Sequence, residues 1–256
     1  MKKIALLVSV LLLTAGFSVF GQTTPTITVA AAANIATVGE PLKAAFAAKY
    51  PGSSVEFVFG ASGALTTQIQ NGGPFQVFLS ADVDFPKKLY DGGFAAAAPQ
   101  IYATGKLILL SVKPLDFSKG LAVLADPSVT QFAIANPEIA PYGKAAQEAL
   151  TKAGLWDVVK AKVVTAQTIT QALQFTVGAT GIGFVNKSAL YTKDLAAYAS
   201  KEGVNWYEVG SSYSPINQAF VVLKSAAGNQ TALNFATFLS SPEARAIFQK
   251  AGYALP

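Results

Sequence analysis

The stretch Val58-Phe-Gly-Ala-Ser62-Gly-Ala-Leu-Thr-Thr-Gln-Ile69 carries a pattern that recurs along the chain. Residues 55–59 are mostly apolar and predict a strand, the small residues after them predict a tight turn, and a helix is expected to begin at Ser62. The first amides of a helix have no carbonyl in their own helix to bind, and the helix dipole is positive at that end. Such a junction binds an anion without a charged side chain. A single Ser-Gly-Ala is also an ordinary helix cap, so the anion-site hypothesis depends on the other junctions.

Strand and helix patterns alternate from this stretch toward both ends of the chain, which predicts an α/β fold with parallel sheets. Three more junctions carry small or polar residues: Asn34 after a strand at 26–32, Tyr142-Gly143 before a helix from Lys144, and Thr168-Ile169 before a helix through Leu173. In open α/β sheets, ligands bind outside the carboxyl ends of the strands, which is where such junctions lie.

Two segments are placed to cross between lobes. Residues 101–112 form one long strand pattern with Gly105 inside it, where a glycine often marks a bend. Residues 211–215 separate two later strands and provide a second crossover. The chain is therefore expected to form two α/β lobes, the second inserted into the first. The expected division is a signal peptide at 1–21, the first part of lobe 1 at 22–104, lobe 2 at 105–214, and a return to lobe 1 at 215–256.

The N-terminus has the pattern of a secretory signal peptide. Lys2 and Lys3 precede an almost wholly apolar run at 4–14, and Val19 and Gly21 suit a cleavage site near Gly21. A membrane anchor is the alternative, but the apolar run is too short to span a bilayer comfortably. No later segment is apolar enough to do so. We therefore expect a soluble mature protein in the periplasm.

Composition excludes several functions. The 256 residues include no cysteine and no histidine, which removes disulfides, zinc sites, Ser-His-Asp triads and cysteine nucleophiles. The net charge is +5 without a dense basic run, so no nucleic-acid partner is expected. We predict a protein that is not an enzyme and has no cofactor. A carboxylate enzyme using Asp82 with Glu138 is the other class considered, although Asp82 and Asp84 are expected to cap the next helix.

The four junctions divide two to each proposed lobe, so a cleft between the lobes would be lined by converging N–H groups and neutral donors. An amino-acid site would use an arginine for the carboxylate. The single arginine, Arg245, and Lys144 are both expected to be solvent-exposed. Neutral donors fit a small, fully deprotonated oxyanion. For two of the junction residues a simpler role without ligand contact stays open: Tyr142 could pack on the cleft wall, and Asn34 could cap a helix.

Several stretches together resemble molybdate-binding proteins, the extracytoplasmic receptors of molybdate ABC importers. They cover nearly the whole mature chain in order: Val29-Ala-Ala-Ala-Ala-Asn-Ile35, Gly60-Ala-Ser-Gly-Ala-Leu-Thr-Thr-Gln-Ile69, Gly73-Pro-Phe-Gln-Val-Phe-Leu-Ser-Ala-Asp82, Ala135-Asn-Pro-Glu-Ile-Ala-Pro-Tyr-Gly143 and Gly183-Phe-Val185. The resemblance implies a bilobal periplasmic-binding-protein type II fold, two α/β lobes joined by two crossover strands. It implies molybdate, and with it tungstate, as the ligand, an ABC permease as the partner, and a monomer. A receptor for another tetrahedral oxyanion, sulfate or phosphate, is the alternative.

The same resemblance assigns the contacts. Ser62 would donate its hydroxyl and N–H, and Ile169 a backbone N–H, with Ala33 doing likewise. Asn34 stands where many members have serine, and its amide could donate instead. Tyr142 would offer its N–H, its phenol or both. The chain departs from the family pattern at Asn186, where some members have a tyrosine on the anion, and at Gly105-Lys106, where the pattern contains asparagine.

Overall fold

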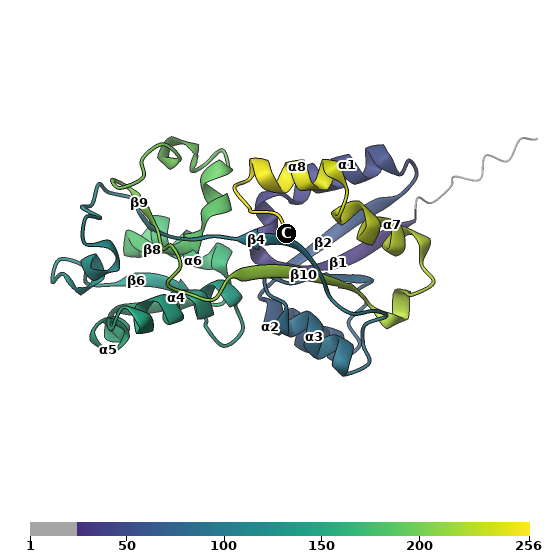
Figure 1. Cartoon of the computed structure of the whole chain (residues 1–256), viewed down its shortest axis with the longest axis horizontal. Helices are drawn as coiled ribbons and strands as arrows, with labels where there is room; N and C mark the ends of the chain where they lie inside the picture. The colour runs from purple at the N-terminus through teal and green to yellow at the C-terminus, as the bar shows by residue number, and fades with distance from the viewer. Residues whose placement is uncertain (1–24) are drawn as a thin grey trace, which may run out of the picture.

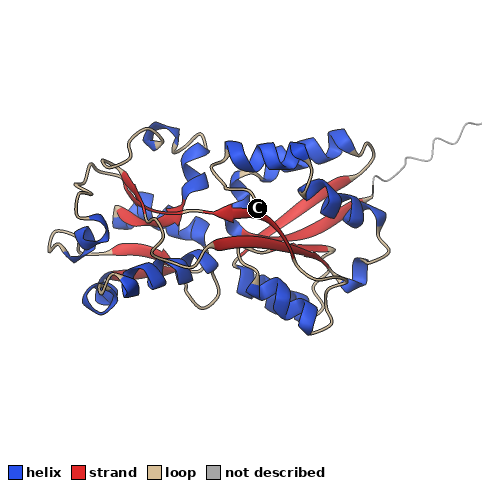
Figure 2. Cartoon of the chain, viewed as in Figure 1, coloured by secondary structure: helices blue, strands red, loops and turns tan. Residues whose placement is uncertain are grey.

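The structure, a computed structural model, describes residues 25–256, so the predicted signal peptide at 1–21 lies outside the described residues. In the described part, two five-stranded sheets lie side by side along the long axis of the molecule (Figures 1 and 2). We call each sheet with its helices a lobe. The two-lobed α/β fold predicted from the sequence is confirmed.

Lobe 1 holds both ends of the described chain. Its strand order is β2 (Ser54–Gly60), β1 (Thr26–Ala32), β3 (Val77–Leu79), β10 (Ile216–Val222) and β4 (Gln100–Gly105). Its helices are α1 (Gly39–Lys49), α2 (Ser62–Gln70), α3 (Asp84–Asp91), α7 (Gln230–Leu239) and α8 (Pro242–Lys250), with 3-10 turns η1 (Ala33–Thr37) and η7 (Lys224–Ala226). Strands β1, β2 and β3 are parallel, and β10 runs antiparallel to β3 and β4.

Both faces of the lobe 1 sheet are covered, which explains the apolar run of β1. Val29 and Ala31 pack in a core with Phe46 of α1 and Phe235 of α7, whereas Ala30 faces the other core, with residues of α2 and α3. Successive strand side chains point to opposite faces, so a strand buried on both sides reads as continuously apolar. Figure 1 shows α1, α7 and α8 on one side of the sheet and α2 and α3 on the other.

Lobe 2 repeats this plan. Its strand order is β7 (Val163–Ala166), β6 (Phe132–Ala135), β8 (Ile182–Asn186), β5 (Leu107–Ser111) and β9 (Trp206–Glu208). Its helices are α4 (Pro141–Lys152), α5 (Trp156–Val159) and α6 (Ile169–Phe175), with a π-helical turn η4 (Thr176–Thr180) and 3-10 turns η2 (Gly120–Ala125), η3 (Lys160–Lys162), η5 (Lys187–Tyr191) and η6 (Ala196–Tyr198). Strands β6, β7 and β8 are parallel, and β5 runs antiparallel to β8 and β9.

The crossovers correct one expectation and refine another. The sheets are mixed rather than wholly parallel, because the segments that pass between lobes enter each sheet antiparallel to its neighbour. The single long strand expected at 101–112 is two strands in different sheets, β4 ending at Gly105 and β5 beginning at Leu107. The second crossover joins β9 to β10 through the predicted segment 211–215. The exact domain boundaries stay a prediction.

Candidate functional site

The five residues predicted from the sequence meet at one small cavity between the lobes. Ala33, Asn34 and Ser62 come from lobe 1, and Tyr142 and Ile169 from lobe 2. All five are between 0% and 6% exposed. The remaining lining residues are Ala32, Gly60, Ala61, Ala81, Ala140 and Pro141. None of the lining residues is charged, so the cavity is walled by neutral groups.

Ser62 is placed by the junction between β2 and α2. The helix begins at Ser62, as predicted, so the Ser62 amide lies in a first turn where no carbonyl of its own helix can accept from it. Its Oγ accepts a hydrogen bond of 3.1 Å from the backbone N–H of Ala81. A hydroxyl that accepts there keeps its own proton to donate, so Ser62 offers both an O–H and an N–H.

Asn34 lies in η1, directly after β1, and is 1% exposed. Its Nδ2 donates to Gln218 Oε1 at 2.9 Å and to Tyr253 Oη at 3.0 Å. Its Oδ1 is the one buried side-chain polar atom without a partner among residues 25–256. The amide group expected to donate to a ligand is thus held by Gln218 and Tyr253, neither of which lines the cavity.

Tyr142 lies within the first turn of α4, which corrects the predicted helix start at Lys144. Pro141 opens the helix, since proline suits a first turn that needs no N–H. The Tyr142 Oη accepts from Gln218 Nε2 at 3.1 Å. Burial raises the pKa of the Tyr142 phenol well above its ordinary value, so the hydroxyl keeps its proton. Both the backbone N–H and the phenol of Tyr142 are therefore donors.

Ile169 is positioned by a helix cap. Thr168 precedes α6, as predicted, and its side chain accepts from the Gln171 N–H at 3.0 Å. The Ile169 side chain is buried in the lobe 2 core, so its contribution to the cavity is apolar surface and a first-turn N–H. The next residue links the lobes, because Thr170 Oγ1 donates to the Ala33 carbonyl at 3.1 Å.

The lobes are closed on each other around this cavity. Gly63 N donates to the Ile139 carbonyl at 2.9 Å across the cleft. A side chain at Gly63 would approach the Ile139 backbone to 3.0 Å, so glycine permits this close contact. The cavity is about 10 Å³, room for roughly one water molecule. A four-oxygen anion is larger, so its binding requires the walls to move apart slightly.

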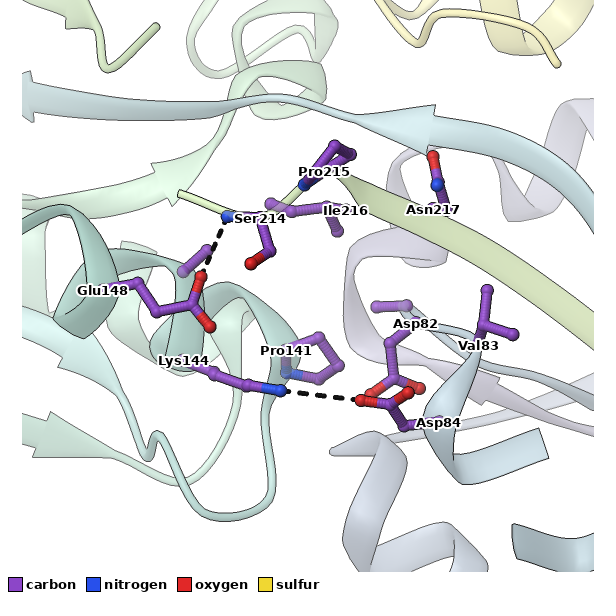
Figure 3. Close-up of a pocket in the computed structure, with 12 residues that line it drawn as sticks. Asp82, Val83, Asp84, Pro141, Lys144, Glu148, Ser214, Pro215, Ile216 and Asn217 are labelled. Carbon is purple, nitrogen blue, oxygen red and sulfur yellow. Dashed lines mark hydrogen bonds and ion pairs between the residues drawn. The ribbon is translucent and has the colours of Figure 1, made fainter. Parts of the chain in front are cut away.

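A larger pocket of about 310 Å³ opens beside the cavity, between α4 and the start of α3 (Figure 3). Lys144 of α4 faces Asp84 there at 3.5 Å, with both side chains more than half exposed, as expected for Lys144. Asp82 accepts from Ser80 Oγ at 2.8 Å and from the Phe85 N–H at 3.2 Å. Asp82 therefore caps the start of α3, which confirms the capping expectation for that residue.

Two buried residues behind the cavity were missed by sequence reasoning. Gln218 and Tyr253 stand 184 and 219 positions from Asn34, so no local pattern relates them to it. A glutamine in the middle of the apolar strand β10 was the available signal for Gln218. Asn186, the departure from the family pattern, donates to Ser188 Oγ, which in turn bonds Tyr253 Oη at 3.1 Å. Asn186 thus supports Tyr253 and does not line the cavity.

Neither a metal centre nor a membrane span is found within residues 25–256. The described residues contain no cluster of three or more acidic, histidine or cysteine side chains suited to a metal ion. None of the described helices combines the length and the apolar character needed to cross a bilayer.

The chain is similar to proteins of known role. The family model described as bacterial extracellular solute-binding protein matches residues 27–254. The chain is 39% identical over 228 residues to the molybdate-binding protein ModA of Rhodobacter capsulatus, covering 88% of this chain and 86% of that protein. It is 39% identical over 229 residues to the molybdate-binding protein ModA of Azotobacter vinelandii, covering 89% of each.

A solved structure gives the same result. The periplasmic molybdate-binding protein of Azotobacter vinelandii matches with a TM-score of 0.82 and 38% identity, over 90% of this chain and 99% of that chain. The resemblance to molybdate-binding proteins stated from the motifs is confirmed by these relatives. The chain belongs to the bacterial extracellular solute-binding protein family.

Proposed function

We propose that this protein captures molybdate, and with it tungstate, in the cavity between its lobes and delivers the anion to an ABC importer. The observation that carries the proposal is a small cavity between the lobes, walled by neutral groups at the start of three helices, one from lobe 1 and two from lobe 2. The names of the relatives at 39% identity support molybdate as the anion. Because those relatives are binding proteins, the carboxylate-enzyme hypothesis loses its basis.

The donors available to the anion come from both lobes. Lobe 1 offers the Ser62 hydroxyl and N–H together with the backbone N–H groups of Ala33 and Asn34, and lobe 2 offers the N–H groups of Tyr142 and Ile169. A hydrogen bond to a charged group contributes roughly 1.5–3 kcal/mol. Since an anion held this way bonds both lobes at once, it stabilises the closed form over the open one.

Export, lobe movement and docking on the permease complete the proposed function. The signal peptide at 1–21 directs a monomer to the periplasm, where the lobes, divided at 104/105 and 214/215, open and close about the two crossovers. The closed form then docks on the membrane permease. Lys106, between β4 and β5, lies at the first crossover and is ion-paired with Glu208 of β9 at 2.8 Å.

Thermal unfolding with a series of anions tests the proposal. A ligand at 100 times its Kd stabilises the folded state by about 2.7 kcal/mol, which raises the Tm of a chain this long by roughly 5–10 °C. We expect that rise with molybdate and tungstate, and a smaller one with sulfate or phosphate. Ser62→Ala, which removes one hydroxyl donor, should lose most of the rise. Equal rises with sulfate and molybdate would favour a general oxyanion receptor, and no rise with molybdate would refute the proposal.

A further inference from the structure

The unpartnered Oδ1 of Asn34 points to a role for a residue outside the cavity. Asn34 lines the cavity, while its Nδ2 is turned away toward Gln218 and Tyr253. In a planar carboxamide the oxygen and nitrogen point in different directions, so with Nδ2 committed to residues outside the cavity, the unpartnered Oδ1 is the carboxamide atom available to it. A buried acceptor without a donor is destabilising, because it has lost its hydrogen bonds to water. A fully deprotonated oxyanion only accepts hydrogen bonds, so this oxygen would repel it.

A second arrangement of the same side chains removes the conflict. Turning a carboxamide by 180° exchanges its oxygen and nitrogen at nearly the same positions. If Asn34 alone turned, its oxygen would meet Gln218 Oε1 at 2.9 Å, and two acceptors would face each other. If Gln218 alone turned, two amide nitrogens would face each other at that distance. The two carboxamides must therefore turn together.

With both carboxamides turned, Asn34 Oδ1 faces Tyr253 Oη at 3.0 Å, so Tyr253 moves its proton from the Asn34 carbonyl to Oδ1, and that carbonyl keeps the bond from Thr37 Oγ1 at 2.9 Å. Every group in the network then has a partner. Gln218 Nε2 then donates to Asn34 Oδ1 over the 2.9 Å contact and to Tyr102 Oη, also 2.9 Å away, while Tyr102 donates to the Ser80 carbonyl at 3.1 Å. Gln218 Oε1 accepts the proton of Tyr142 Oη over the 3.1 Å contact. The Asn34 amide group is then on the cavity side and donates to the anion.

We propose that Gln218 is a positioning residue that sets the orientation of the Asn34 carboxamide, and thereby selects a fully deprotonated oxyanion for the cavity. The inference rests on the proposed function, since it concerns the same cavity. Anion binding favours the arrangement with the Asn34 amide facing the cavity. In that arrangement the phenol of Tyr142 is committed to Gln218, so Tyr142 contacts the anion through its backbone N–H. The opposite arrangement presents an acceptor and suits an anion that carries a proton, such as hydrogen phosphate.

Gln218→Glu tests the proposal, because a carboxylate only accepts and so keeps the Asn34 amide turned away from the cavity. Loss of one hydrogen bond to a charged ligand predicts a molybdate Kd roughly 10- to 100-fold higher. Asn217→Asp is the matched control: it adds the same charge at the next position of β10, where Asn217 bonds Thr104 and lines the pocket of Figure 3 instead. Its Kd should change by less than about 3-fold, the remaining effect being screened charge.

The ratio of the molybdate affinity to the phosphate affinity distinguishes an effect of the Asn34 orientation from an effect of the added charge. Molybdate and hydrogen phosphate are both dianions at pH 8, so an added carboxylate weakens both alike. We expect Gln218→Glu to lower the molybdate-to-phosphate affinity ratio and Asn217→Asp to leave it unchanged. If Gln218→Glu binds molybdate as tightly as Asn217→Asp, or if the ratio is unchanged, the inference is overturned while the proposed function stands. If the wild-type chain binds no molybdate, both fail together.

A measurement on the wild-type chain tests the inference even if Gln218→Glu does not fold. The side-chain amide NMR signals of Asn34 and Gln218 should both shift when molybdate is added, because both carboxamides change partners. Assignment follows from the loss of each signal in Asn34→Ser and Gln218→Met. Molybdate binding that leaves both signals in place would overturn the inference.

Discussion

At the scale of single residues, Gly105 is the clearest link between the crossover and the cavity. A Cβ at this position would lie 2.0 Å from Tyr142 Oη and 2.7 Å from Gln218 Nε2. The phenol of Tyr142 therefore occupies the space that a side chain at position 105 would need. This gives a physical meaning to the departure from the family pattern at Gly105, for which the sequence alone offered no interpretation.

Gly105→Ala should accordingly displace Tyr142 and Gln218. We expect a loss of about 1–3 kcal/mol in the free energy of unfolding, as for other overpacked positions, together with a weaker affinity for molybdate. Gly178→Ala is the control, because a Cβ there meets nothing within 4 Å. Chemical denaturation and titration of both variants check this. A Gly105→Ala protein with wild-type stability and affinity would contradict the close contact.

The buried carboxyl of Asp82 makes the stability of the folded state depend on pH. Burial raises the pKa of its carboxyl, against the opposing hydrogen bonds from Ser80 and Phe85. A raised pKa in the folded state means that the folded state binds the proton more tightly than the unfolded chain does. Ionised Asp82 therefore costs stability above its folded-state pKa, and the cost disappears as the pH falls through that pKa toward the unfolded value of about 3.9.

Asp82→Asn keeps an oxygen that can accept from Ser80 and Phe85 but carries no charge. We expect the variant to be more stable than the wild-type chain at pH 7, with the difference shrinking as the pH is lowered to 4. Asp157→Asn, at an exposed carboxylate paired with Lys160 at 2.7 Å, should change stability by less than about 0.5 kcal/mol. Denaturation at several pH values checks both. A lower stability of Asp82→Asn at pH 7 would show that the charge itself is needed.

At the scale of elements, the helix starts place the donors. The helix starts at Ser62 and next to Thr168 were predicted from small and polar residues after apolar strands, and both are confirmed. The start of α4 was predicted three residues late, because Pro141 was assigned to the preceding loop although proline is favoured in a first helical turn. The crossover at 101–112 was predicted as one long strand, whereas the chain forms two strands in different sheets, β4 ending at Gly105 and β5 beginning at Leu107.

Thr168→Ala tests the element that holds Ile169. Loss of a helix cap costs about 1 kcal/mol of stability. The Ile169 N–H lies in the turn that this cap organises, so molybdate affinity should fall by up to about 10-fold. Asn229→Ala removes an equivalent cap, since Asn229 accepts from the Ala232 N–H at 3.0 Å, at the start of α7. Asn229→Ala should lose similar stability and keep its affinity. Equal affinities in the two variants would show that Ile169 does not depend on its cap.

At the scale of the whole molecule, the lobes meet through contacts that sequence patterns do not reveal. The C-terminal segment lies at the middle of the molecule (Figure 1), where Ala254 pairs with Thr104 of β4. From there Tyr253 bonds Asn34 of lobe 1 and Ser188 of lobe 2. The junction residues that line the cavity could be predicted because each follows a local strand pattern. Gln218 and Tyr253 could not, because only the folded chain brings them to Asn34.

The proposed function requires that neutral donors from both lobes hold one molybdate anion. Isothermal titration of molybdate into the protein tests it most directly. We expect a stoichiometry of one anion per chain and a Kd of about 1 μM or tighter, which corresponds to about 8 kcal/mol. A titration without heat, in a protein whose unfolding temperature molybdate also leaves unchanged, would contradict it.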